Sequence, residues 1–283
     1  MNLLSLSKKF TILLLVCSLY LCPLVQAQAI DTAFFQCRYK LSYINDSLSL
    51  RKQTDEMRLL IGEQYTLFSS YINYTADSLT KANPAEYEPQ MNEVDGRMRI
   101  SAAKTRLKRS DNIETYIIQR HSGDVHCLGM VTPRYYEYIE ERSLPAWEMD
   151  SDTEEILGYI CQKAQARYGG RDWTVWFTSD IPIGEGPWLL RGLPGLILKA
   201  HDAEQQYVFE CISLGQLHSA QTIETDILKQ YRSTTKEDYW KGRAKVFEDP
   251  LSALSGSVDL SSVDMSRVPA RNRQPKQYNP IER

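Results

Sequence analysis

The short connections between strand-like runs are the feature that most constrains the fold of this chain. Aromatic and β-branched runs come in pairs that are separated only by brief, turn-forming segments. Such connections are too short for a crossover between parallel strands, which takes about a dozen residues or more. The pairs are 57–61 with 65–72, 159–168 with 172–178, and 196–200 with 207–214. We therefore predict a mostly β fold: an antiparallel, meandering sheet, with a curved half-barrel as one form of it.

Further strands are expected at 34–44, 114–120, 125–131 and 135–141, and together these runs suit one β-rich domain over 30–250. Residues 73–110 are polar and charged, which predicts a long surface excursion with a short helix at 76–82. A capping box that begins at Thr234 and Thr235 predicts one C-terminal helix over 236–247, ended by Pro250.

Leu193-Pro194-Gly195-Leu196 reads as a tight turn that leads into a buried strand. Pro194 presets a backbone φ near −65°, and Gly195 can take the positive φ that a type II turn needs next. The apolar residues 196–198 then begin the strand.

This turn belongs to a longer pattern that resembles the GLPGLI family, a group of secreted Bacteroidetes proteins of unestablished function. The resemblance is close over 158–214, and three departures from it are Arg191, Asp202 and the final Arg283. It implies an exported protein and assigns no activity. The matching segments are Tyr159-Ile160-Cys161-Gln162-Lys163-Ala164, Gly170-Arg171-Asp172-Trp173-Thr174-Val175-Trp176-Phe177-Thr178, Asp180-Ile181-Pro182-Ile183, Gly186-Pro187-Trp188, Gly192-Leu193-Pro194-Gly195-Leu196-Ile197 and Asn279-Pro280-Ile281-Glu282.

The N-terminus has the pattern of a secretory signal peptide over residues 1–27. Lys8 and Lys9 precede an apolar core, and cleavage after Ala27 or after Ala29 satisfies the small-residue rule. A lipoprotein signal centred on Cys22 is the alternative, although a bulky leucine precedes that cysteine. We expect a periplasmic, outer-membrane-associated or extracellular protein whose mature chain has no transmembrane segment. Its formal net charge of −3 gives no general attraction to nucleic acid.

Four cysteines follow the signal peptide: Cys37, Cys127, Cys161 and Cys211. In an exported chain they allow up to two disulfides, and Cys161 with Cys211 is the pairing singled out here. Free, buried thiols are the alternative, because a domain of this size does not need disulfides to fold.

A turn-rich block of glycines and prolines at 180–188 suggests a ligand-binding lip. Its candidate residues are Trp176 and Trp188 as an apolar floor, with Asp180 and Arg191 as polar contacts. The alternative is an ordered connection that packs Trp188 into the core.

Metal, cofactor and catalytic patterns are weak. His201 and Asp202, in a predicted turn, are the metal candidates that remain, because His121 and His126 are expected on separate strands and there is no HExxH. The acidic run 150–155 lacks the glycine of a calcium loop, which favours a solvated loop. No nucleophile stands in a recognisable catalytic context, so we expect no cofactor and no enzyme activity.

Residues 251–283 form a basic tail that contains proline and has little apolar surface to bury, which predicts disorder. Arg267, Arg271, Arg273, Lys276 and Arg283 suit either an anionic surface or an acidic partner. The sequence as a whole favours an exported envelope module that binds an apolar ligand or a partner protein. The alternative is a metal-binding accessory to an outer-membrane uptake system.

Overall fold

The computed structural model describes residues 29–94, 97–101, 103–132, 134–224, 231–249 and 276–283. The expected signal peptide and residues 250–275 of the tail, with Arg267, Arg271 and Arg273, lie outside this described part.

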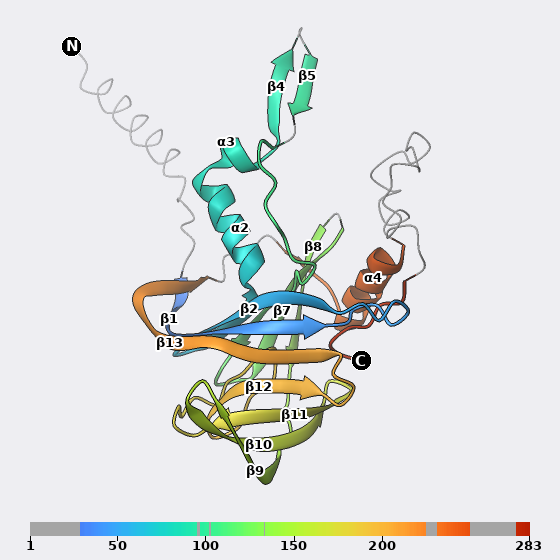
Figure 1. The fold of residues 1–283 in the computed structure, drawn as a ribbon. Helices are drawn as coiled ribbons and strands as arrows, with labels where there is room; N and C mark the ends of the chain where they lie inside the picture. Colours follow the sequence, from blue (N-terminus) through green and yellow to red (C-terminus); the bar gives the residue numbers. More distant parts are fainter. Residues whose placement is uncertain (1–28, 95–96, 102, 133, 225–230, 250–275) are drawn as a thin grey trace, which may run out of the picture.

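Within the described ranges, twelve strands form one large sheet. Figure 1 shows a separate hairpin, made of β4 and β5, that stands apart from it. The order in the sheet is β14-β8-β7-β6-β3-β2-β1-β13-β12-β11-β10-β9. All of these pairings are antiparallel except that between β14 and β8. The strands are β1 (Ala29–Tyr43), β2 (Gln53–Gly62), β3 (Tyr65–Ser70), β6 (Thr115–Gln119), β7 (Asp124–Val131), β8 (Arg134–Glu141), β9 (Glu148–Ile156), β10 (Tyr159–Tyr168), β11 (Arg171–Thr178), β12 (Leu196–Asp202), β13 (Tyr207–Glu224) and β14 (Arg232–Ser233). The mostly β, antiparallel fold is confirmed.

The sheet consists of two meanders. Strands β1, β2, β3, β6, β7 and β8 form the first meander and β9 to β13 the second, and in each meander every strand pairs with the next one along the chain that belongs to the sheet. They join where β1, with 15 residues, pairs along most of its length with β13, with 18 residues. This long pairing makes a single sheet from two locally folded halves.

The polar excursion contains regular structure. Helix α2 (Tyr71–Ala82) is followed by α3 (Pro84–Tyr87) and by the hairpin of β4 (Gln90–Val94) and β5 (Arg97–Ser101). The strand expected to reach residue 72 ends at Ser70, whose side chain caps α2 by accepting from the backbone N–H of Asn73. Helix α4 (Lys236–Glu248) is capped by Thr235, which accepts from Asp238. None of the helices in the described ranges is long and apolar enough to cross a membrane.

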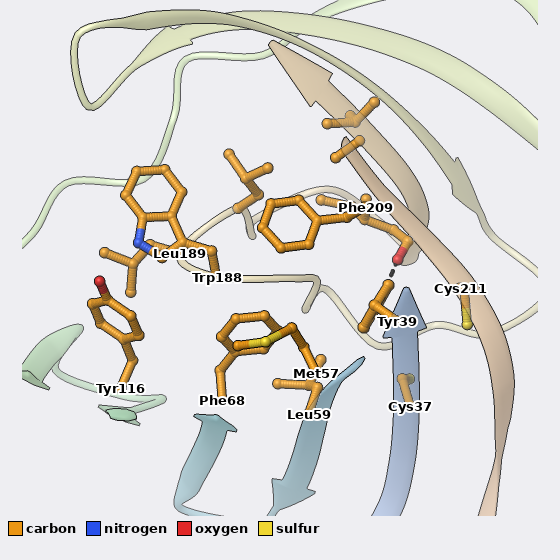
Figure 2. Close-up of a cluster of buried hydrophobic side chains, with 14 of the residues drawn as sticks. Cys37, Tyr39, Met57, Leu59, Phe68, Tyr116, Trp188, Leu189, Phe209 and Cys211 are labelled. Carbon is orange, nitrogen blue, oxygen red and sulfur yellow. Dashed lines mark hydrogen bonds between the residues drawn. The ribbon is translucent and has the colours of Figure 1, made fainter. Parts of the chain in front are cut away.

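One face of the sheet, here called the core face, carries a cluster of large buried side chains, part of which Figure 2 shows. Trp188, which is 1% exposed, lies with its ring centroid 5.7 Å from that of Trp173, and Phe209 is 6.3 Å from Trp173. Tyr39 is also fully buried, and its hydroxyl donates to the carbonyl of Ile197 at 2.8 Å. The segment that carries Trp188 therefore packs on the core face of the sheet. This packing argues against an apolar ligand carried on that face.

The turn over residues 192–195, here called the signature turn, needs its glycines for a different reason from the one predicted. Gly192, not Gly195, takes the positive φ, at 94°. Gly195 is required by a close approach, because a Cβ there would lie 2.0 Å from the carbonyl oxygen of Thr178. The type II turn predicted at Gly195 is therefore wrong.

All four cysteines are free and buried, so the Cys161–Cys211 disulfide is a wrong prediction. Cys161 lies on β10 and Cys211 on β13, and two strands separate them in the sheet. Burial raises the pKa of Cys161 to about 11 and also raises the pKa of Cys37. The thiols of Cys161 and Cys37 therefore stay protonated near neutral pH and are poor nucleophiles.

The acidic run predicted as a solvated loop is part of the edge strand β9. Lysines on β10 and β12 neutralise three of its carboxylates: Lys163 lies 3.1 Å from Asp150 and 3.0 Å from Asp152, and Lys199 lies 2.8 Å from Glu154. Charged side chains on an edge strand also discourage pairing with another sheet.

Disorder of the tail is a wrong prediction for residues 276–283, which lie against the sheet. Tyr278 forms a β-bridge with Asp46, and the backbone N–H of Arg283 donates to the carbonyl of Gly169 at 2.9 Å. Glu282 pairs with Arg142 and with Lys236. Backbone and side-chain contacts thus hold the segment, although it offers little apolar surface.

Below about pH 4 we expect segment 276–283 to lose its protection from hydrogen exchange, measured by mass spectrometry against pH 7. Burial opposes the charge of Asp46, but N–H donors led by that of Gln277 lower its pKa below the ordinary 3.8. Hydrogen bonds from Arg283 lower the pKa of Glu204 below 4.5. Because docking lowers both pKa values, these contacts stabilise the docked segment at neutral pH and are lost as these groups become protonated. Unchanged protection of the segment at pH 3 would contradict this account.

Candidate functional site

The four residues predicted to form a ligand-binding lip do not converge. Trp173 and Trp188 pack together inside the sheet, whereas Trp176 lies on the opposite face of β11. There the ammonium of Lys199 lies 4.7 Å from the Trp176 ring centroid. Asp180 is exposed in the turn that follows β11. Trp188 is core, as the alternative interpretation held.

Arg191 has a structural role. Its Nε lies 3.6 Å from Oε2 of Glu185, a carboxylate that is 5% exposed, and Arg120 holds the other oxygen at 3.0 Å. Arg191 also donates to the carbonyl of Arg120 at 3.1 Å. Arg191, together with Arg120, therefore neutralises the buried carboxylate of Glu185.

Asp202, one of the two metal candidates, is occupied by an ion pair with Arg171 at 2.7 Å, where both side chains are at most 2% exposed. Its other oxygen accepts the backbone N–H of Tyr207 at 2.8 Å. The ring of His201 lies 5.5 Å from that of Trp176. Within the described ranges, no three His, Cys, Asp or Glu side chains are grouped so as to hold a metal ion.

A groove of about 670 Å³ lies on the outer face of the first meander. Its walls are α2, the segment before β6 and the far end of β13, and Figure 1 shows α2 rising from the sheet beside β2. Three tyrosines line it, Tyr74, Tyr135 and Tyr231, so we call it the tyrosine groove. Its volume lies in the range of small-molecule sites.

Strand alternation gives the groove an apolar floor. Met57, Leu59 and Ile61 point into the main core, so Arg58 and Leu60 project from the other side of β2. Leu60 belongs to a second buried cluster on that side. The members of this cluster are Ala33, Leu60, Leu67, Ile117, Leu128 and Ile223.

One buried carboxylate fixes the wall. Asp55, which is 4% exposed, accepts from the hydroxyl of Ser70 at 3.3 Å, from the amide of Asn112 at 3.0 Å and from the hydroxyl of Ser110. The amide of Asn73 donates to the carbonyl of Asn112 at 3.0 Å. The first turn of α2 and the segment before β6 are therefore tied to β2, which makes this wall preorganised.

The tyrosines present aromatic surface at the groove. Tyr135 is 53% exposed and Tyr74 is 39% exposed. The ring of Tyr231 meets that of Tyr135 edge to face, with centroids 5.4 Å apart. Burial raises the pKa of Tyr231 to about 12. These rings offer flat apolar faces with hydroxyl groups at their edges.

Arg58 is the unusual charge in the groove. Its Cζ lies 3.5 Å from the Tyr74 ring centroid, and its Nε donates to the hydroxyl of Ser69 at 3.1 Å. Burial lowers the pKa of Arg58 to about 10, although contact with Tyr74 favours its charge. At neutral pH it is therefore still a cation, but a poorly solvated one.

Two of the carboxylates in the groove already have cationic partners. Asp77 pairs with Arg109 at 2.7 Å, and Glu114 pairs with Arg243 of α4 at 2.7 Å. Arg58, in contrast, makes no ion pair within the described ranges.

Sequence reasoning missed the tyrosine groove because its residues come from segments far apart in the chain. One local signal was present: Tyr74, Asp77, Ser78 and Lys81 share one face of a helix by their spacing. A second was Arg58, a lone cation within the apolar part of a strand.

The comparisons with known proteins place the chain in a family. Two solved structures of PNGF-II, in space groups P21 and C2, are 18% and 17% identical to it. Each match has a TM-score of 0.47 and covers 75% of this chain. The chain spans about a third of the length of those structures, 34% and 33%. No curated protein matches it. A protein-family model matches residues 72–236, more than half of the sequence, so this chain belongs to the family described as "N-glycanase peptide, N-terminal domain".

Proposed function

We propose that this chain is an exported envelope module that binds carbohydrate in the tyrosine groove and catalyses no reaction. The observation that carries the proposal is the groove itself: exposed tyrosines over an apolar floor, with polar side chains on a fixed wall. The family description supports the choice of ligand, because it names an N-glycanase. The leader-like N-terminus supports export, to the periplasm, the outer membrane or the medium.

Carbohydrate suits this chemistry. A sugar ring has C–H faces that pack on aromatic rings and hydroxyl groups that need hydrogen-bond partners. Tyr135 supplies an exposed ring, while Ser78 and Gln221 supply hydroxyl and amide groups to the same groove. A lipid would use the rings and floor but would offer no hydrogen-bond partners to these polar groups.

Replacing Tyr135 by alanine is expected to weaken oligosaccharide binding by about tenfold or more, measured by calorimetry with N-glycan-type oligosaccharides. Tyr135 is half exposed and lies outside the main core, so the thermal midpoint is expected to change little. Glycopeptides incubated with the protein are expected to stay intact, since binding without turnover is proposed.

The matched control is Trp176→Ala, which removes a half-buried aromatic ring from the outer face of the second meander. It is expected to leave binding unchanged. Loss of binding in this control, with normal binding by Tyr135→Ala, would place the site on β11 and overturn the proposal for the tyrosine groove.

A further inference from the structure

Within the described residues, the arginine of the tyrosine groove has no anionic partner. Arg58 lines the groove, its Cζ lies 3.5 Å from the Tyr74 ring centroid, and its Nε donates to the hydroxyl of Ser69. Placing a guanidinium in such an environment costs free energy unless an anion compensates it. The ring of Tyr74 compensates part of this cost through its electron-rich face.

The carboxylates that line the groove leave Arg58 without an ion pair. Asp77 and Glu114 are already paired with Arg109 and Arg243. The third carboxylate, that of Glu224, forms no ion pair with Arg58 in the described part of the chain. The carboxylate of a ligand would therefore not have to displace a protein carboxylate from Arg58.

A guanidinium is well matched to a carboxylate. Its planar fork offers parallel N–H donors, which bind the two oxygens of one carboxylate at once. Contact with the Tyr74 ring and the hydrogen bond to Ser69 restrain this fork before any ligand arrives, so less side-chain entropy is lost on binding.

We infer that the tyrosine groove takes acidic carbohydrate, a sugar that carries a carboxylate, and that Arg58 binds this carboxylate while Tyr135 packs against the sugar ring. This inference rests on the proposed function and names the ligand class of the same site. Tyr74 acts as a positioning residue that holds the guanidinium.

The test compares three probes by calorimetry at roughly 0.15 M salt, where long-range attraction between exposed charges is screened. The probes are sialyllactose, lactose and succinate, which are an acidic glycan, its neutral counterpart and a carboxylate without a sugar. Sialyllactose is expected to bind about tenfold more tightly than lactose, and succinate weakly.

In Arg58→Gln this preference is expected to disappear, while lactose affinity stays within about twofold. Arg58→Lys keeps the charge without the planar fork and is expected to retain part of the preference. If Arg58→Gln does not fold, a reduced preference for sialyllactose in Arg58→Lys tests the same role. The matched control is Arg109→Gln, which replaces an exposed arginine of the same groove that is already paired with Asp77. This variant is expected to keep the preference for sialyllactose over lactose.

The outcomes distinguish the role of Arg58 in binding a carboxylate from the proposed binding of carbohydrate. Equal binding of sialyllactose and lactose, both lost in Tyr135→Ala, overturns the role of Arg58 and leaves carbohydrate binding in place. A response to succinate that depends on Arg58, without binding of either glycan, keeps the anion site and overturns the proposed function. No response to any probe overturns both.

Discussion

Replacing Arg171 by methionine is expected to lower the free energy of unfolding by about 3–5 kcal/mol, because it leaves a buried carboxylate without its cation. The Arg171 side chain is 1% exposed, and its Nη1 lies 2.7 Å from Asp202. Its other nitrogens donate to the carbonyls of Ile281 at 2.8 Å and Pro280 at 2.6 Å, and to the side chain of Asn279 at 2.8 Å. One guanidinium thus joins the start of β11, the end of β12 and the C-terminal segment.

The same substitution is expected to release residues 276–283. Equilibrium denaturation measures the loss of stability, and hydrogen exchange measures the release of the segment. Lysine should not rescue the variant, because an ammonium cannot donate to several acceptors that lie in different directions within one plane. The double variant Arg171→Met with Asp202→Asn is expected to recover part of the stability, since it removes the uncompensated charge.

Arg167→Met is the matched control. It lies on the same hairpin and pairs with Asp172 at 3.0 Å, but both side chains are more than 60% exposed. An exposed pair contributes about 0–1 kcal/mol, so this variant should unfold almost like the parent protein. If both arginines proved equally dispensable, the C-terminal segment would not be held by Arg171.

The local parts of the fold were predictable and the non-local parts were not. The hairpin at Gly169 and Gly170 follows from the sequence, because both glycines take positive φ, at 56° and 77°, as its two-residue turn requires. The pairing of β1 with β13 does not follow, since strands at opposite ends of the domain carry no local signal of their partner. The resemblance to the GLPGLI family stays a prediction.

The same difference between local and non-local contacts explains which site residues could be predicted from the sequence. Asp202 looked like a free ligand because its partner Arg171 is distant in sequence and its surroundings include the chain terminus. The tyrosine groove was invisible because Arg58, Tyr74, Tyr135 and Tyr231 meet only after both the sheet and α2 have formed. Trp176 and Trp188 were grouped by composition, although the alternation of a strand puts Trp176 on the face that Trp188 does not contact.

Gly195→Ala is expected to destabilise the fold by about 3 kcal/mol or more, which is a large effect for one methyl group. The new Cβ would lie 2.0 Å from the carbonyl oxygen and 2.6 Å from the carbonyl carbon of Thr178, so backbone, not a flexible side chain, has to move. Thr178 ends β11 and Leu196 begins β12, so the shift would break the pairing of these two residues. The segment before Gly195, which carries Trp188, would then be held less firmly against the core face of the sheet.

Two other glycines, Gly192 and Gly215, serve as controls for Gly195→Ala. Gly192 has a positive φ of 94°, but a Cβ there meets only the flexible side chain of Leu144, so Gly192→Ala should cost about 1 kcal/mol of backbone strain. Gly215 on β13 has open space around it, and Gly215→Ala should change stability by about 0.5 kcal/mol or less. Denaturant unfolding is expected to rank the losses as Gly195→Ala, then Gly192→Ala, then Gly215→Ala. If Gly192→Ala were the more damaging, backbone strain and not close packing on Thr178 would explain why the signature turn needs its glycines.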